Sequence, residues 1–286
     1  MDRTNIGWTS GLLGVMVFSG SLPATRVAVA DLSPLFLTSA RALIAALLGA
    51  CCLIALRHAP PGRGDLPSLV IVALGVVVGF PLLTGLALQH IPAAHSIVFV
   101  GLLPLATAAF AVVRGGERPK PAFWLFSVVG AATVAGFALA RSDGGTLAGD
   151  LLMVAAILAC GLGYAEGATL SRRLGGWQVI SWALLLSLPV MGGIALATMP
   201  QNWGAIGTPA WISLAYVSVF SMFVGFVFWF RGLALGGIAA VGQLQLLQPF
   251  FGLTLAAVVL HEQVAWTMLA STVIVVMCVA GARRFA

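Results

Sequence analysis

Two charged residues, Arg41 and Glu166, stand inside long apolar stretches of this 286-residue sequence and are the first candidates for chemistry. A charge near the centre of a bilayer costs roughly 3 kcal/mol even on the most lenient scale, so it usually has a task. Arg41 is either a contact for a substrate carboxylate or a structural residue that binds backbone carbonyls or the end of a broken helix. Glu166 either carries a coupling proton or pairs with a basic neighbour near the inner membrane surface, because Arg172 follows closely.

Polar and aromatic residues also precede two prolines in apolar stretches: His95 and Phe99 before Pro104, and Gln245 and Gln248 before Pro249. A proline inside a helix leaves a carbonyl one turn earlier without its donor. Such interruptions mark binding sites in repeat-built transporters. Gln245 and Gln248 share a helix face because they are three residues apart. The alternative is that these side chains hold helices together by close packing and interhelical hydrogen bonds.

Other chemistries find little support in the sequence. The cysteines (Cys51, Cys52, Cys160 and Cys278) have no metal or redox spacing. His95 is expected to be a hydrogen-bonded interior histidine, because no carboxylate is near it in sequence. The single lysine, Lys120, lies between two prolines, so a glycine-rich phosphate loop with its lysine is absent. We therefore expect no metal, no cofactor and no enzymatic activity, and any transport should be secondary or facilitative.

The composition indicates that this chain lies in a lipid membrane. Sixty per cent of the residues are hydrophobic and only 8% are charged, and the mean hydropathy is +1.08. Roughly 20 apolar residues cross a bilayer as a helix. On that basis the sequence predicts an all-α integral membrane protein with ten spans, at about 6–28, 33–56, 67–88, 92–113, 121–140, 148–171, 178–199, 208–231, 238–260 and 264–282.

The distribution of the cations predicts the orientation. A cytoplasmic N-terminus places eleven of the fourteen cations inside (Arg3, Arg57, Arg63, Arg114, Arg118, Lys120, Arg172, Arg173, Arg231, Arg283 and Arg284). Only Arg26, Arg41 and Arg141 remain outside or within the membrane. We expect a multi-pass protein of the bacterial inner membrane with both termini in the cytoplasm. The net charge of +6 then reflects topology and attraction to anionic membrane lipid, and no nucleic-acid partner is expected.

The chain carries an internal duplication. Residues 85–93 match residues 232–240 at six of nine positions, and Pro104 and Glu117 recur 145 residues later as Pro249 and Glu262. Five spans in each half would give the halves opposite orientations. The sequence thus predicts two inverted five-helix repeats, residues 1–145 and 146–286, which is the geometric basis of alternating access. Both glutamates are expected at helix ends, in capping or loop hydrogen bonds.

Several of these residues resemble a known family. Ser21-Leu-Pro-Ala-Thr-Arg26, Ser39-Ala-Arg41, the Gly85-Leu-Ala-Leu run, Pro104 and Gly115-Gly-Glu117 are similar to the EamA module of the drug/metabolite transporter superfamily. The second half resembles the closing part of the module through Pro249 and His261-Glu262. The stretches around Tyr164 and Gln245 are most similar to bacterial aromatic-amino-acid exporters of the YddG type. Arg26 and Arg41 have no charged counterparts in the second half, so the two halves are not expected to be equivalent.

The resemblance implies export of Phe, Trp, Tyr and other bulky apolar amino acids, with the small-molecule substrate in a cavity between the repeats. We expect the protein to be a monomer. Phe99 and Tyr164 would hold the ring, while His95, Gln245, Gln248 or freed carbonyls would bind the polar groups. Export of other metabolites or of cationic drugs is the main alternative. A channel or an intramembrane enzyme fits the repeats and the scarce ionisable groups less well.

Overall fold

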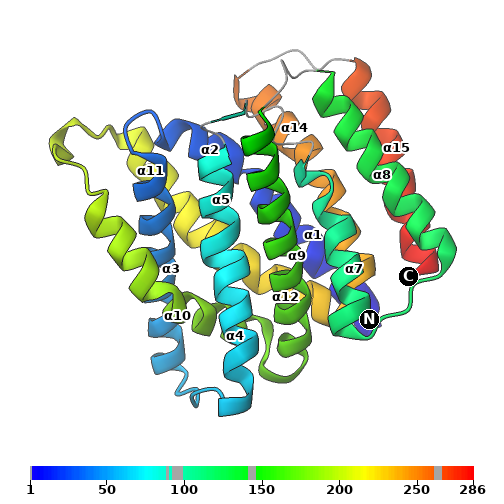
Figure 1. Ribbon diagram of the computed structural model, residues 1–286, viewed down its shortest axis with the longest axis horizontal. Coiled ribbons are helices and arrows are strands. Elements are labelled where there is room, and N and C mark those ends of the chain that lie inside the picture. The colour runs from blue at the N-terminus through cyan, green and yellow to red at the C-terminus, as the bar shows by residue number, and fades with distance from the viewer. Residues whose placement is uncertain (1, 88–89, 92–98, 141–145, 261–265) are drawn as a thin grey trace.

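The computed structural model describes residues 2–87, 90–91, 99–140, 146–260 and 266–286. Within those residues every regular element is helical (Figure 1), which confirms the predicted all-α fold. The α-helices of the first half are α1 (Arg3–Ser19), α2 (Ser21–Ala28), α3 (Pro34–Ala55), α4 (Leu66–Val72), α5 (Phe80–Ala87), α7 (Leu103–Gly115) and α8 (Pro121–Leu139). Those of the second half are α9 (Leu147–Leu174), α10 (Gly176–Ala197), α11 (Thr208–Tyr216), α12 (Gly225–Gly236), α13 (Ile238–Gly242), α14 (Gln248–Leu260) and α15 (Trp266–Phe285).

Short segments of other helix types join several of these helices. Two of them, η2 (Ala73–Gly79) and η4 (Val217–Val224), are π-helical and continue directly into α5 and α12. A 3₁₀ segment, η5 (Gln243–Leu247), separates α13 from α14. The remaining two are η1 (Arg63–Asp65) and η3 (Trp203–Ala205). Single π-helical turns are rare and often lie at functional sites.

Six helical stretches of the described chain are long and apolar enough to cross a membrane: Arg3–Thr25, Pro34–Ala55, Arg63–Ala87, Leu147–Leu174, Gly176–Ala197 and Thr208–Gly236. Two shorter apolar helices cover Leu103–Gly115 and Pro121–Gly136. Large apolar side chains face outward on several of these helices, with Ile54 76% exposed and Leu196 71% exposed. In water such a surface would favour aggregation, whereas lipid solvates it.

Local sequence signals explain where individual helices begin and end. Ser33 accepts a hydrogen bond from the Phe36 N–H at 3.2 Å and Pro34 follows at once, so α3 starts as a capped helix with proline in its first turn. Helix α9 ends at Gly175, whose φ of 95° is a conformation that glycine adopts without steric cost. This turn lets α10 begin at the next residue and fold back along the bundle.

Helices α1 and α12 approach each other closely in an antiparallel contact. Gly7 faces Gly236, and Gly11 faces Gly232, so each helix presents two glycines four residues apart. A Cβ atom added at Gly7 would lie 2.3 Å from the backbone nitrogen of Gly236. Small residues at this spacing let two backbones approach closely in lipid, where the hydrophobic effect does not drive helices together. The contact joins the first helix to the second half of the chain.

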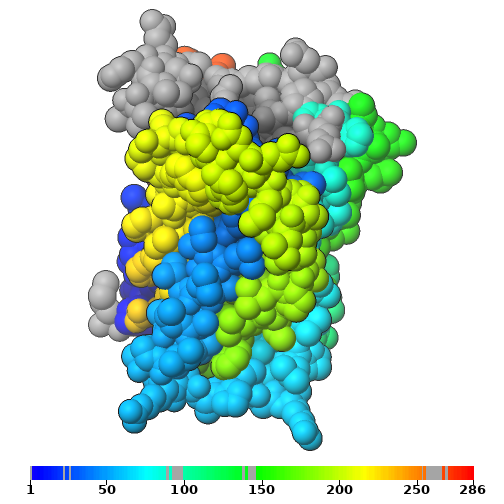
Figure 2. Space-filling view, turned by 90° about the vertical axis from the view of Figure 1, so that its left-hand side faces the viewer, coloured from blue at the N-terminus to red at the C-terminus, as the bar shows by residue number. Residues whose placement is uncertain are grey.

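The two ends of the bundle differ in composition. Both termini lie at the same end (Figure 1), where the Arg283 guanidinium donates to the Asn5 side chain at 2.6 Å and covers the Trp8 ring. The loop before η1 lies at this end as well, and the loop before α11 lies at the opposite one. Figure 2 shows α3 and α10 side by side between these two ends.

Candidate functional site

A small polar cluster lies in the buried middle of the bundle. Tyr164, on α9, accepts a hydrogen bond at 3.3 Å from the amide nitrogen of Gln245, on η5. Both residues are 5% exposed. The Tyr164 ring packs against Phe226 and Trp229, with ring centroids 6.1 and 5.6 Å apart. The structure thus brings together two of the predicted substrate-binding residues and surrounds them with aromatic rings of α12.

The tight backbone of η5 places Gln245 in this cluster. The 3₁₀ turn follows α13 and ends where α14 begins at Gln248. Pro249 is the second residue of α14 and Pro104 the second of α7, so both prolines lie in a first helical turn. The predicted span 238–260 is thus broken into α13, η5 and α14, and Pro249 directly follows the 3₁₀ segment. A first turn has free N–H groups in any case, so a proline there removes no helical hydrogen bond.

Arg41 points from α3 toward this cluster. One terminal nitrogen of its guanidinium lies 3.3 Å from the sulfur of Met222, on η4, the segment that continues into α12. The Nε atom is buried and has no hydrogen-bond partner. A thioether is a weak acceptor. Among the described residues Arg41 contacts neither a backbone carbonyl nor a carboxylate, so the structural role predicted as an alternative for it is not seen.

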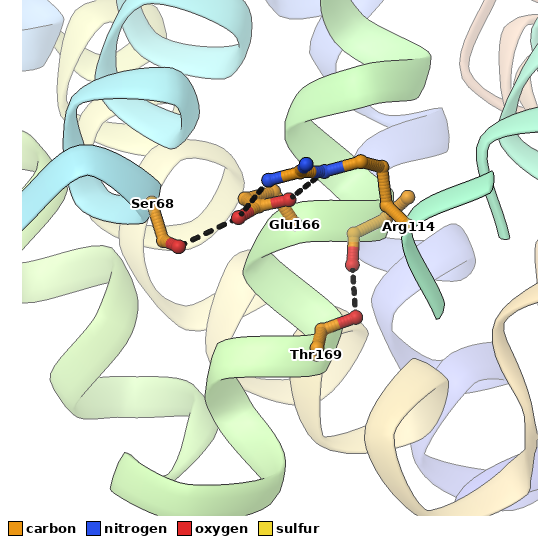
Figure 3. Close-up of polar contacts among 5 residues, drawn as sticks. Ser68, Arg114, Glu166 and Thr169 are labelled. Carbon is orange, nitrogen blue, oxygen red and sulfur yellow. Dashed lines mark hydrogen bonds and ion pairs between the residues drawn. The ribbon is translucent and has the colours of Figure 1, made fainter. Parts of the chain in front are cut away.

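Glu166 belongs to a separate ionic cluster (Figure 3). Its carboxylate accepts two hydrogen bonds from Arg114, on α7, at 2.8 and 3.0 Å, and a third from the Ser68 hydroxyl at 2.6 Å. The side chain is 7% exposed, whereas that of Arg114 is 46% exposed. Glu166 therefore pairs with a basic residue, as one prediction had it, but the partner comes from another helix rather than from Arg172. Both carboxylate oxygens accept hydrogen bonds from the charged Arg114 guanidinium in a bidentate ion pair, which protonation of Glu166 would weaken. Glu166 is therefore poorly placed to carry a coupling proton.

Glu117 joins the two halves of the chain at the end that holds the termini. Its two carboxylate oxygens accept hydrogen bonds from the backbone N–H groups of Ile238 and Ala239, at 2.7 and 2.8 Å. Arg172 donates to the same carboxylate at 2.9 Å. The first turn of a helix leaves such N–H groups unpaired, and a carboxylate both satisfies them and complements the helix dipole. The predicted capping role is thus seen for Glu117, and the helix it caps is α13.

The other predicted site residues lie elsewhere. Phe99 lines an apolar groove of about 260 Å³ between α7 and α9, together with Leu102, Ala106 and Ile157. Gln248 is half-buried at the start of α14. His95 and Glu262 lie outside the described residues. Phe99 also packs against the large buried core to which Tyr164 belongs.

Two residues of the cluster were not predicted from the sequence. Trp229 is fully buried beside Tyr164, and its indole N–H has no acceptor. Met222 contacts Arg41 from the π-helical segment. Met222, Phe226 and Trp229 recur at i, i+4 and i+7, a spacing that places them on one helix face. A tryptophan well inside an apolar stretch, away from the interfacial positions that tryptophan favours, was the available signal.

Metal chemistry has no ligand set in the part of the chain that the structure describes. No group of three or more His, Cys, Asp or Glu side chains gathers there. The cysteines within it are free thiols, with Cys160 and Cys278 buried.

Comparison with known proteins identifies the family. The model of the EamA-like transporter family matches residues 5–139 and again residues 147–283. The chain belongs to the EamA-like transporter family. It is therefore a multi-pass membrane transporter and not an enzyme, as the resemblance implied.

Individual relatives agree with this assignment. The chain is 63% identical to the uncharacterized transporter YdeK of Bacillus subtilis (strain 168), over the full length of both proteins. It is 23% identical to the uncharacterized transporter YvbV of the same organism, over 92% of this chain and 86% of that one. A solved structure titled only as the crystal structure of a protein has a TM-score of 0.83, covers 99% of both chains and is 20% identical. That likeness shows the fold.

Proposed function

We propose that this EamA-family transporter exports aromatic and other bulky apolar amino acids from the bacterial cytoplasm by alternating access. The observation that carries the proposal is the bond between Tyr164 and Gln245 in the buried, ring-lined middle of the bundle. Tyrosine and glutamine bind polar groups of a substrate without adding charge, while rings of α12 provide an apolar wall. A zwitterionic amino acid with a large side chain matches such a site, because it needs few protein charges.

Alternating access requires two similar halves, and several features support that arrangement. The family model matches each half once. Helices α7 and α14 begin 145 residues apart, as do α5 and α12, and the two π-helical segments begin 144 residues apart. We infer ten spanning helices in two inverted repeats, 1–145 and 146–286, with both termini in the cytoplasm. This is the usual construction of repeat-built transporters.

The ionic contacts at the end with the termini fit this mechanism. The carboxylates of Glu166, Glu117 and Asp65 pair there with Arg114, Arg172 and Arg173. Glu117 bonds directly to α13 of the other half. If this end faces the cytoplasm, these contacts close the path on that side, and they must open for a substrate to enter. Partly exposed pairs contribute little each, so such a closure is reversible.

Export of cationic drugs is the competing function. A desolvated cation needs an acid or several ring faces in its site. The central cluster offers ring faces but no acid among the described residues, because Glu166 binds Arg114 and Ser68. Arg41 contacts Met222 on the segment that leads into α12, and its positive charge would repel a cation. We therefore favour the amino acid over the cationic drug.

Counterflow in proteoliposomes tests the proposed function. Purified protein is reconstituted with unlabelled Phe inside the vesicles, and uptake of labelled Phe is followed without nucleotide. We expect saturable uptake that Trp competes with and glucose does not, and we expect the Tyr164→Phe variant to take up less at subsaturating Phe. Robust transport of a quaternary ammonium compound with no Phe flux would assign the protein to drug efflux instead.

A further inference from the structure

Arg41 carries a positive charge that no described residue balances. The ion pairs among described residues use Arg114, Arg172 and Arg173, and each of their carboxylates is already taken. The Arg41 guanidinium donates to the Met222 sulfur at 3.3 Å. The residue as a whole is half-buried, but its Nε atom is buried and has no hydrogen-bond partner among the described residues. A buried, unpaired charge is costly unless something binds it. An arginine without a counter-charge is suited to bind an anion such as a carboxylate through charge-assisted hydrogen bonds.

The groups around Tyr164 show what kind of anion would fit. Among the described residues, the Trp229 N–H is a second buried donor that finds no acceptor, and the Gln245 amide oxygen is a buried acceptor that finds no donor. Both side chains contact Tyr164, Trp229 by its ring and Gln245 by its amide nitrogen. The cluster therefore combines an unpaired donor at Trp229 with an unpaired neutral acceptor at Gln245, and the positive charge of Arg41 lies at Met222. No acidic side chain among the described residues joins it.

The residues that contact Arg41 and Tyr164 lie along one side of the cluster. Met222, Phe226 and Trp229 share a face of the η4–α12 stretch, with Arg41 at Met222 and Tyr164 against Phe226 and Trp229. Seven residues of helix rise roughly 10 Å. A molecule that is charged at one end and apolar along its length would span this wall, with its charged end at Arg41.

We propose that Arg41 is the carboxylate-binding residue of the central site, so that the substrates are organic monocarboxylates with an aromatic or other apolar side group. This rests on the proposed function and narrows it. The substrate carboxylate would bind the Arg41 guanidinium in a site with little water. The ammonium of an amino acid would bind only the neutral amide oxygen of Gln245. An aryl-substituted acid without an amino group should therefore bind, and the matching amine without a carboxylate should not.

Three probes that differ in one group each test this on the purified full chain: L-phenylalanine, 3-phenylpropionate and 2-phenylethylamine. Affinities are measured by isothermal titration. We expect 3-phenylpropionate to bind within about fivefold of Phe and 2-phenylethylamine to bind more than about tenfold more weakly, because a hydrogen bond to a charged group is worth at least that factor. The inference is overturned if the amine binds as well as the acid, or if neither probe binds.

Variants then assign the effect to Arg41. Arg41→Met keeps an unbranched side chain and removes the charge, and it should fold because the charge it removes has no counter-charge among the described residues. We expect it to lose more than about tenfold in affinity for 3-phenylpropionate while its affinity for 2-phenylethylamine stays or rises. Arg41→Lys should retain part of the affinity for the acid, because it keeps a charge but not the guanidinium fork. Arg118→Gln, which removes an exposed cation outside the cluster, is the control and should match the parent.

The ratio of the two affinities is the decisive readout, because partial misfolding lowers both and leaves their ratio unchanged. If Arg41→Met keeps the parent ratio while the parent protein transports Phe, the carboxylate site is refuted and the proposed function stands. If the parent shows no Phe flux but binds 3-phenylpropionate in an Arg41-dependent manner, the carboxylate site stands and amino-acid export fails.

Discussion

The Glu117 carboxylate accepts a hydrogen bond from the backbone N–H of Ile238 at 2.7 Å, across 121 residues of sequence. This contact joins the loop between α7 and α8, in the first half, to the first turn of α13, in the second half. It also orders the start of the segment that carries Gln245 into the central cluster. A carboxylate at one end of the molecule is thus linked through the backbone to the proposed substrate site.

Glu117→Ala should destabilise the protein more than loss of its ion pair alone. The change removes two charge-assisted hydrogen bonds to backbone N–H groups, so we expect a loss of roughly 1–3 kcal/mol. Arg172→Gln removes only a partly exposed partner and should cost less than about 1 kcal/mol. Thermal unfolding in detergent, followed by circular dichroism, compares the two variants. Equal losses would show that the capping bonds contribute nothing.

Glu166→Gln tests whether Glu166 carries a coupling proton. Because Arg114 and Ser68 hold the carboxylate, we expect the variant to fold and the pH dependence of flux to keep its shape. The change should cost roughly 1–3 kcal/mol of stability, since it weakens a charge-assisted pair. Proteoliposome flux at several pH values provides the measurement. A pH profile that becomes flat would return Glu166 to the role of a proton site.

Tyr164→Phe should weaken substrate binding with little effect on folding. The variant keeps the ring that packs on Trp229 and loses only the hydroxyl that accepts the Gln245 hydrogen bond. We expect affinity for Phe to fall about five- to tenfold, which corresponds to the net worth of one hydrogen bond. Titration calorimetry measures this affinity. Tyr216→Phe is a matched control, because its hydroxyl bonds to the Val17 carbonyl near the other end of the bundle, and its affinity should stay at the parent value.

Gly7→Ala and Gly192→Ala should have opposite effects on stability. A methyl group at Gly7 would meet the backbone of α12 at 2.3 Å, whereas none of the described atoms outside its own helix lies within 4 Å of the corresponding position at Gly192. We expect Gly7→Ala to destabilise by about 1–3 kcal/mol through overpacking. Gly192→Ala should stabilise by about 0.5–1 kcal/mol through helix propensity. A shift of the melting temperature in the same direction for both variants would contradict the close contact of α1 with α12.

The proposed orientation predicts that Gly62 and Gly204 lie on opposite sides of the membrane. Both residues are exposed, and their loops lie at opposite ends of the bundle (Figure 1). In a background without the native cysteines, a membrane-impermeant thiol reagent added to whole cells should label Gly204→Cys and not Gly62→Cys. Labelling of both residues from outside, or of Gly62→Cys alone, would reject the orientation.

The sequence correctly predicted helices such as α3, α8 and α9 to within three residues of their observed ends. These predictions depend on local properties, because an apolar stretch of about 20 residues in lipid must form its backbone hydrogen bonds within a helix. The sequence also singled out Arg41, Tyr164, Glu166 and Gln245. Charged or polar groups are costly in apolar stretches, so their positions were informative without any knowledge of their partners.

The sequence by itself thus determined the class of protein, the approximate helix positions and the candidate residues, because each depends on composition and short-range pattern. Only the tertiary structure decided the partners: Glu166 with Arg114 instead of Arg172, Glu117 with the start of α13, and Arg41 with a methionine beside Tyr164. Partnership depends on how helices distant in sequence rotate and approach one another. The spacing of Gly7 and Gly11 shows that a helix can pack closely here, but not that Gly232 and Gly236 of α12 are the partners.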